Sequence, residues 1–375
     1  MTSRERLMTA FRKGTPDRVP MPLRMWKFMR KHYAHLPDEV DRQLAAQEEF
    51  GIDIFHYAPN APLPCFDATG EAWRDDVEID ISHKVCGDRN VWERTIHTPA
   101  GDLHDVKQSL ILKTGSGSGP EIIEGLIKDP KRDIPKYRYM HADPALVDAD
   151  AAIEMQQRIG DRGIVVGNAN SPIDCRDAMS QADFLMLYHD DREAFREIVT
   201  IGAEAMMAET QRWLDAGFEV IKTWWFYASP SSGWSPRIYE EMFLPHLVRH
   251  VEQVHSHSAV YIYYDDGKMR QFVDFYVDAG IDVLMTCAPP PMGNADPAEM
   301  KEKYGNRVCL MGGIDAVNEV NLSTPEKIRE MVNGRLDIFM PGGAYVMDGS
   351  NSLVYETPAE NVRALAKAGR EFGVY

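Results

Sequence analysis

Strand-length apolar runs alternate with segments of helical periodicity through most of this chain. The runs begin near residues 52, 163, 218, 260, 281, 307 and 337, and segment 191–217 shows the helical period. Unbroken apolar runs of this kind are typical of strands that helices cover on both faces. The alternation predicts an α/β fold, a (β/α)8 TIM barrel, with a doubly wound sheet as the alternative.

One segment departs from this alternation. Residues 71–112 alternate polar and apolar side chains around turn formers at 87–90 and 99–102. This pattern predicts an antiparallel hairpin insertion, which we expect to lie over one end of the barrel. No internal repeat or linker interrupts the remainder, so a single domain over residues 1–375 is expected.

Net charge and cysteine spacing limit the partners and the cellular compartment. The formal net charge is −17, and no Lys/Arg cluster relieves it locally, which argues against nucleic acid and anionic membranes as partners. No run of 18 apolar residues and no signal-peptide pattern is present, so a cytoplasmic protein is expected. The five cysteines lack CxxC spacing, which is typical of reduced thiols.

Polar and aromatic residues gather where the predicted strands end, and in a barrel these ends face the active site. We expect a small-molecule ligand there. Arg24, flanked by apolar residues near the N-terminus, could also point inward. The candidates for catalysis or ligand binding are His56, Tyr57, Asn60, Asn168, Asn170, Asp174, Trp224, Trp225, Tyr227, Tyr264, Asp265, Asp266, Cys287 and Tyr345.

Each candidate also has a structural interpretation. Asp265 and Asp266 could be a metal pair or a general base with a neighbour that raises its pKa, but one of them could cap the next helix. Cys287 could bind a soft metal or act as a nucleophile, although a lone cysteine is more often a packed thiol. His56 suits acid/base chemistry or a structural hydrogen bond.

Trp224 and Trp225 could stack on an aromatic or cationic ligand. Because successive strand side chains face opposite ways, at most one of the two is expected to line a pocket. No GxGxxG after a strand, GxxxxGK[ST], HExxH or GxSxG pattern is present, so dinucleotide, nucleotide, zincin and serine hydrolase sites lack their usual support.

Five long motifs occur in a familiar order: 2–23, 167–199, 215–255, 308–315 and 356–373. In this order they resemble the uroporphyrinogen decarboxylase superfamily, which also contains corrinoid-linked and cobalamin-independent methyltransferases. The resemblance implies a (β/α)8 barrel. It also implies a possible homodimer, since members commonly form dimers.

Key residues of true uroporphyrinogen decarboxylases are altered here. The resemblance implies an arginine-rich N-terminal motif for substrate carboxylates, of which Arg24 and Arg30 remain. The family's catalytic aspartate falls near Asn60, and its late histidine near Gly343. A tetrapyrrole acid needs many cationic contacts, so porphyrinogen decarboxylation itself is not expected.

The segment 95–106 resembles one that is common in the methyltransferase branch. That branch implies zinc held by a His-x-Cys pair and a late cysteine, but the matching positions are Tyr264, Asp266 and about Gly343. Only Asp266 of these could bind a metal, and a catalytic zinc usually has three protein ligands. Cys287, His56 or Asp265 would have to complete the set, and we assign Asp266 and Cys287 as the candidate metal ligands.

Three functions follow from these observations. The first is a methyltransferase that demethylates a small methoxyaromatic or methylamine donor, with Asp266 or Tyr264 as the acid, and passes the methyl group to a corrinoid protein or tetrahydrofolate. Corrinoid is expected on a partner protein, because no DxHxxG signature is present. The second is a decarboxylase or lyase of a small acid held by Arg24. The third is a non-catalytic binding protein.

Overall fold

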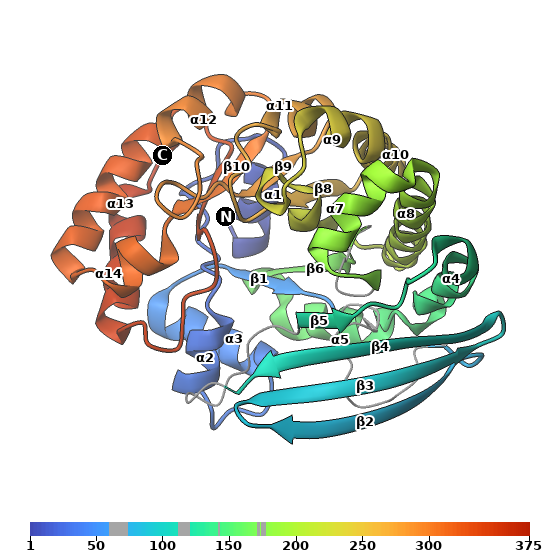
Figure 1. Cartoon of the computed structure of the whole chain (residues 1–375). Coiled ribbons are helices and arrows are strands. Elements are labelled where there is room, and N and C mark those ends of the chain that lie inside the picture. The colour runs from blue at the N-terminus through green and yellow to red at the C-terminus, as the bar shows by residue number, and fades with distance from the viewer. Residues whose placement is uncertain (60–73, 112–120, 142, 171–172, 174–177) are drawn as a thin grey trace.

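The computed structural model describes residues 1–59, 74–111, 121–141, 143–170, 173 and 178–375, and contains two sheets. A parallel sheet has the strand order β1-β6-β7-β8-β9-β10-β11, and helices surround it (Figure 1). A separate antiparallel sheet has the order β2-β3-β4-β5. The predicted α/β class is therefore confirmed, and neighbouring strands of the parallel sheet follow each other in sequence, as in a barrel.

The parallel strands are β1 Ile54–Tyr57, β6 Gly163–Ala169, β7 Val220–Trp224, β8 Val260–Tyr264, β9 Val283–Thr286, β10 Cys309–Ile314 and β11 Tyr345–Gly349. The helices before β6 are α1 Ser3–Phe11, α2 Trp26–His32, α3 Glu39–Phe50, α4 Pro130–Tyr137 and α5 Ala149–Ile159. Those that follow are α7 Gln181–Asp190, α8 Arg192–Asp215, α9 Pro236–Met242, α10 Leu244–Ser256, α11 Val273–Asp278, α12 Pro297–Tyr304, α13 Pro325–Phe339 and α14 Ala359–Phe372. A π-helix spans Ala316–Asn321.

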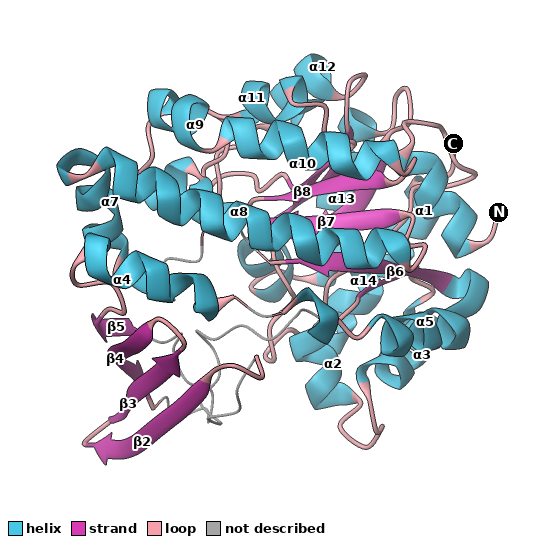
Figure 2. Cartoon of the chain, turned by 90° about the vertical axis from the view of Figure 1, so that its right-hand side faces the viewer, coloured by secondary structure: helices cyan, strands magenta, loops and turns pink. Residues whose placement is uncertain are grey.

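Alternation along the strands divides the apolar residues into two cores. The inner core joins side chains such as Val166, Ile262 and Met311 to Phe11 of α1, which closes the amino-terminal end of the sheet. The outer core lies between the sheet and the helices. Figure 2 shows the long helices α8 and α10 running along the outer face of β7 and β8.

The prediction of eight regular strands is not met within the described residues, which form seven in the parallel sheet. An irregular extended segment takes the place between β11 and β1: Pro20 accepts a hydrogen bond from Met347 N (2.9 Å), and Met21 accepts one from Asp53 N (3.0 Å). Proline has no N–H to donate to a ladder. Pro20 and Pro22 therefore keep this segment from forming a regular strand.

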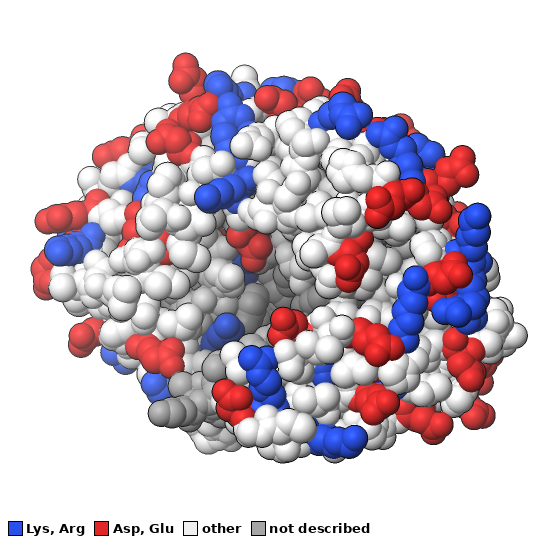
Figure 3. Space-filling model, viewed as in Figure 1, with Lys and Arg blue, Asp and Glu red and all other residues white. Residues whose placement is uncertain are grey.

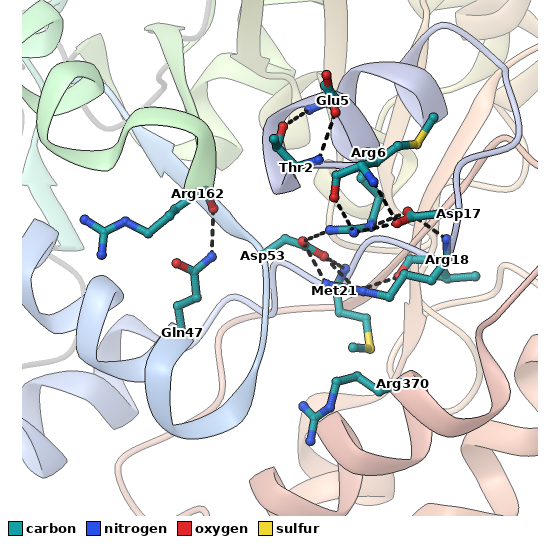
Figure 4. Close-up of polar contacts among 12 residues, drawn as sticks. Thr2, Glu5, Arg6, Asp17, Arg18, Met21, Gln47, Asp53, Arg162 and Arg370 are labelled. Carbon is teal, nitrogen blue, oxygen red and sulfur yellow. Dashed lines mark hydrogen bonds and ion pairs between the residues drawn. The ribbon is translucent and has the colours of Figure 1, made fainter.

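Asp53, just before β1, ties this segment to the start of the chain (Figure 4). Its buried carboxylate contacts Arg6 Nη1 (2.8 Å), Arg18 Nη2 (3.0 Å) and the backbone N–H of Met21 (2.8 Å). Arg6 also pairs with Asp17 (2.7 Å). One carboxylate thus holds α1, the extended segment and β1 together.

The predicted hairpin insertion is present but extends further. It comprises β2 Glu78–Cys86, β3 Arg89–Thr98, β4 Gly101–Leu110 and β5 Glu121–Glu124, so a strand follows the expected boundary at 112. Its sheet lies beside α4 (Figure 2), where Lys136 Nζ donates to Asp102 O (3.1 Å). Nowhere in the described part of the chain is a helix both long and apolar enough to cross a membrane.

Candidate active site

The carboxyl ends of β7 and β8 present four side chains on the inner face of the sheet. Strand alternation places Lys222 and Trp224 of β7 beside Tyr264 and Asp266 on and after β8. Tyr264 Oη donates a hydrogen bond to Asp266 Oδ2 (3.0 Å). Burial raises the pKa of Tyr264, so its phenol stays protonated and acts as a donor.

Lys222 is fully buried and enclosed by aromatic rings. Its Nζ lies 2.9 Å from the ring centroid of Trp224, 4.6 Å from that of Tyr57 and 4.9 Å from that of Tyr264. It donates to Asn168 Oδ1 (3.2 Å). Burial, and then the nearby Arg24 guanidinium, hold the pKa of Lys222 well below its ordinary value, which favours the neutral amine.

We call the space bounded by Tyr57, Lys222, Trp224, Tyr264 and Asp266 the chamber. Arg24 reaches it from the extended segment. Its side chain pairs with buried Asp348 of β11 (Nε–Oδ2, 2.7 Å) and also donates to Gly349 O. Its Cζ lies 5.3 Å from the Tyr264 ring centroid. Among the described residues, the third guanidinium nitrogen, Nη1, is buried without a hydrogen-bond partner, and so is Tyr57 Oη. Both groups are therefore available to a ligand.

A cavity of about 540 Å³ opens beside this cluster. Its lining includes Arg24, Tyr57, Trp224, Trp26 and Arg30, together with Asp38, Glu39 and Arg158. The face seen in Figure 3 is hollowed near its centre, with acidic and basic side chains at the rim. Mostly aromatic and apolar walls with a few converging polar groups are typical of small-molecule sites.

Asp265 points to the other side of the sheet. Its carboxylate accepts a hydrogen bond from Tyr276 Oη (3.1 Å) and lies beside the buried rings of Tyr263 and Tyr239. Burial, and then the charge of Asp266, raise the pKa of Asp265 to about 8. Asp265 is thus on the opposite side of the sheet from the chamber, where Asp266 lies.

Most of the other predicted site residues lie outside the chamber. His56 hydrogen-bonds Gln43 of α3 (3.1 Å) on the outer side of β1, and it lines the outer part of the cavity. Trp225 stacks on Tyr263, and Tyr345 stacks on Phe339 (4.4 Å between centroids), both in the outer core. The remaining predicted residues are Tyr227, whose ring is tilted against that of Phe226 (4.1 Å between centroids), Asn170, whose backbone N–H donates to Glu209 (2.7 Å), Cys287, which is buried in the outer core, and Asn60 and Asp174, which lie outside the described residues.

The candidate metal ligands Asp266 and Cys287 would need a further protein donor to form a catalytic zinc site. In the described ranges no three His, Cys, Asp or Glu side chains are grouped so that they could hold a metal ion. Burial raises the pKa of the Cys287 thiol to about 12, so in the absence of a metal this cysteine is a protonated, packed thiol. These described side chains do not fit a three-ligand zinc centre, and the assignment of Asp266 and Cys287 as ligands stays a prediction.

A family model for uroporphyrinogen decarboxylase (URO-D) matches residues 109–372, which is most of the chain. The chain belongs to the uroporphyrinogen decarboxylase family. A methylcobamide:CoM methyltransferase MtaA of Methanosarcina barkeri (strain Fusaro / DSM 804) is 25% identical to this URO-D protein over 61% of the chain and 64% of the relative. The uroporphyrinogen decarboxylase of Trichodesmium erythraeum (strain IMS101) is 25% identical over 45% of each chain.

A solved methyltransferase structure from Methanosarcina mazei covers 99% of both chains with a TM-score of 0.68 and 18% identity, which supports the fold. This URO-D protein is thus similar to the methyltransferase-like branch of its superfamily. The chain spans less than two thirds of the length of the curated relatives described above.

Sequence reasoning missed Lys222 and Asp348, and it named Tyr57 and Arg24 as candidates without placing them together. A signal was present for Lys222: it is the one cationic side chain inside the apolar run 218–226. A lysine within a strand that is covered on both faces must be enclosed with a partner or carry a function. Asp348 gave no comparable signal, because its partner Arg24 is distant in sequence.

Proposed function

We propose that this URO-D protein is a methyltransferase that demethylates a small O- or N-methylated donor and passes the methyl group to a corrinoid protein or to tetrahydrofolate. The observation that supports it best is the chamber at the ends of β7 and β8. There a buried amine and a Tyr264–Asp266 pair adjoin the rings of Tyr57 and Trp224. The similarity to methylcobamide:CoM methyltransferases supports the same class of reaction.

Demethylation requires an acid at this position. The bond between the methyl carbon and the donor's oxygen or nitrogen breaks with its electron pair on that atom, while the acceptor's nucleophile supplies the pair for the new bond. The leaving atom then takes a proton. The Asp266 carboxyl group at the edge of the chamber, with Tyr264 bonded to it, is the proposed proton donor, and the Lys222 amine lies beside the rings of Trp224 and Tyr264.

The rings would hold the donor. Trp224 and Tyr57 lie edge to face, 6.0 Å between centroids, and Trp26 continues the same wall 5.9 Å from Tyr57. Aromatic surfaces of this kind bind a planar or methylated ligand by stacking and exclude water from the reacting atoms. A corrinoid acceptor would belong to a partner protein that meets the open end of the cavity.

The test is methylation of free cob(I)alamin by the purified protein, with a panel of methoxylated benzoates and methylamines as donors. The decrease in cob(I)alamin absorbance measures the rate. Asp266→Asn is expected to lower the rate by about 100-fold or more, the usual contribution of a positioned acid. Tyr264→Phe should lower it less, because the carboxyl group remains.

Asp278→Asn, which changes an exposed carboxylate on α11, serves as the control and should leave the rate unchanged. Alkylation no faster than without protein for every donor, or equal rates for Asp266→Asn and wild type, would count against the proposal.

Arg24 favours a second candidate, a decarboxylase or lyase of a small acid, because its unpartnered Nη1 can hold a carboxylate. In that case carbon dioxide release from an aromatic or aliphatic acid would need no methyl acceptor. Release measured in the absence of cob(I)alamin and tetrahydrofolate would favour this candidate over methyl transfer.

A further inference from the structure

The antiparallel sheet has a long free edge. β2 is its outermost strand, and among the described residues only β3 pairs with it. Figures 1 and 2 both show β2 as the strand of this sheet that lies farthest from the parallel sheet and its helices. Residues 82–86 of β2 are exposed, including the apolar side chain of Val85 at 61%. An edge of this kind is a surface on which another strand can pair.

The tight turn at residues 87–88 decides which backbone groups of β2 face outward. Cys86 and Arg89 flank this turn and are partners in the ladder, and residues in that position exchange both backbone hydrogen bonds. Because the exchange alternates along an antiparallel pair, the even-numbered residues of β2 bond to β3. The N–H and C=O groups that point away from the sheet therefore belong to residues 79, 81, 83 and 85.

We propose that β2 pairs with β2 of a second copy of this chain, antiparallel and centred on Ser82, so that two antiparallel sheets join into one. In this register Ile81 lies opposite His83 of the second copy, and Ile79 lies opposite its Val85. Every outward-facing backbone group of both strands is then bonded. A dyad centred on Ile81 or His83 instead leaves one of these four residues without a partner in the strand.

The side chains favour the same register. Asp80 lies opposite Lys84 of the second copy, and the dyad repeats this pair of opposite charges. Asp80 also pairs with His97 through Oδ2 (3.1 Å), but its side chain is 83% exposed and remains accessible to an ammonium group. On the other face, the half-buried Ile79 meets the exposed Val85. A strand that matches its own reverse favours a second copy over an unrelated strand.

The position of β2 lets two copies meet without collision. In both views the parallel sheet and its helices lie beyond β4 and β5, on the side away from β2 (Figures 1 and 2). The parallel sheets of the two copies would thus lie at opposite ends of the joined sheet. Each chain has a formal net charge of −17, and this separation also keeps most of the like charges apart.

Sedimentation velocity of the full chain between about 1 and 100 µM, the range of small interfaces, tests the association. Wild type is expected to dimerise. Lys84→Glu replaces two attractive pairs with two repulsive ones and should weaken the dimer about 10-fold or more. The double variant Asp80→Lys/Lys84→Glu restores opposite charges and should return the affinity to near that of wild type.

Lys327→Glu is the matched control, because it makes the same charge change at an exposed position on α13 and should leave dimerisation unchanged. Urea unfolding of Lys84→Glu should have the midpoint of wild type. An unchanged midpoint shows that the lost association does not come from a lost sheet.

Cysteine cross-linking tests the register itself. With the exposed Cys86 changed to serine, Ser82→Cys would face its own copy in a non-hydrogen-bonded pair, at a Cα–Cα distance of about 4.5 Å that suits a disulfide. Mild oxidation should give a covalent dimer. Glu78→Cys in the same serine background lies more than about 25 Å along the strand from its copy and should not cross-link. With Cys86 retained, Glu78→Cys should cross-link, because the two residues are opposite each other.

A wild type that stays monomeric at about 100 µM would overturn this dimer and leave the edge to a strand of another protein or to solvent. A dimer that Lys84→Glu does not weaken, or that the double variant does not restore, would use a different surface. Equal cross-linking of Ser82→Cys and Glu78→Cys in the serine background would rule out pairing centred on Ser82.

Discussion

At the scale of single residues, two adjacent aspartates have opposite environments because a strand alternates its side chains. Asp266 continues the inner face of β8 and meets Tyr264, whereas Asp265 enters the outer core beside Tyr276. Asp265 is fully buried, and one of its oxygens lacks a partner among the described residues. Its environment therefore favours the neutral acid.

The pKa of Asp265 predicts a pH dependence of stability. Since burial raises this pKa from 3.8 to about 8, the folded state binds more protons than the unfolded state between these values. The contribution of Asp265 to the free energy of unfolding should thus fall as pH rises through this range, by about 1 kcal/mol per pH unit.

Urea unfolding of wild type and Asp265→Asn at pH 5, 6.5 and 8 measures this effect. The variant should gain stability relative to wild type as pH rises, since the amide cannot ionise. Asp266→Asn removes a neighbouring charge and should move the dependence to lower pH. A difference between Asp265→Asn and wild type that is constant across the range would contradict the assignment.

At the scale of elements, the antiparallel sheet depends on a buried ion pair. Arg94 of β3 holds Asp105 of β4 through two hydrogen bonds, of which the Nε–Oδ1 bond is 2.9 Å long, and Lys107 Nζ lies 3.5 Å from the same carboxylate. The three side chains are almost fully buried. This polar group sits where the alternation of a sheet with one covered face would place apolar residues.

Asp105→Ala should therefore remove the buried carboxylate that Arg94 and Lys107 both contact. We expect a loss of about 3–5 kcal/mol in the stability of this sheet. Hydrogen exchange of the β3 and β4 amides measures it locally. Asp102→Ala, which removes an exposed partner of His97 at the β3–β4 turn, is the control and should change protection little. Equal exchange in both variants would show that the buried pair contributes nothing.

At the scale of the whole molecule, the two ends of the parallel sheet meet through the segment around Pro20, and Asp53 holds that junction. Arg18 also bridges to Val374, so the C-terminal end of the chain joins the same region. Figure 2 shows both termini on the same side of the molecule. The junction is non-local in sequence, and it couples the first helix to the last.

Asp53→Ala is expected to lower the free energy of unfolding by about 3–5 kcal/mol, because Arg6 and Arg18 lose a fully buried carboxylate. Chemical denaturation followed by tryptophan fluorescence gives the value. Asp41→Ala, which breaks a half-exposed pair with Arg158, should change the midpoint only slightly. Similar losses in the two variants would argue against a special role of the junction.

Much of this molecule followed from local patterns. The apolar runs from 52 to 307 located six of the parallel strands, and the polar alternation of 71–112 located the antiparallel insertion, because side-chain periodicity is a property of each segment alone. The run near 337 was wrongly predicted as a strand: it lies at the end of α13, and β11 begins only at Tyr345. The alternation also predicted that at most one of Trp224 and Trp225 would face the pocket. It could not decide which one, because the inner face exists only once the sheet has curved.

The sequence by itself determined the β/α order, the family resemblance and the position of Tyr264 and Asp266 at a strand end. Only the tertiary structure brought Arg24, Tyr57 and Lys222 together and separated Asp265 from Asp266. The physical reason is distance along the chain. Strand alternation acts between neighbours, whereas an enclosed chamber forms only when remote strands and the extended segment meet around it, and burial then sets the protonation of the groups inside.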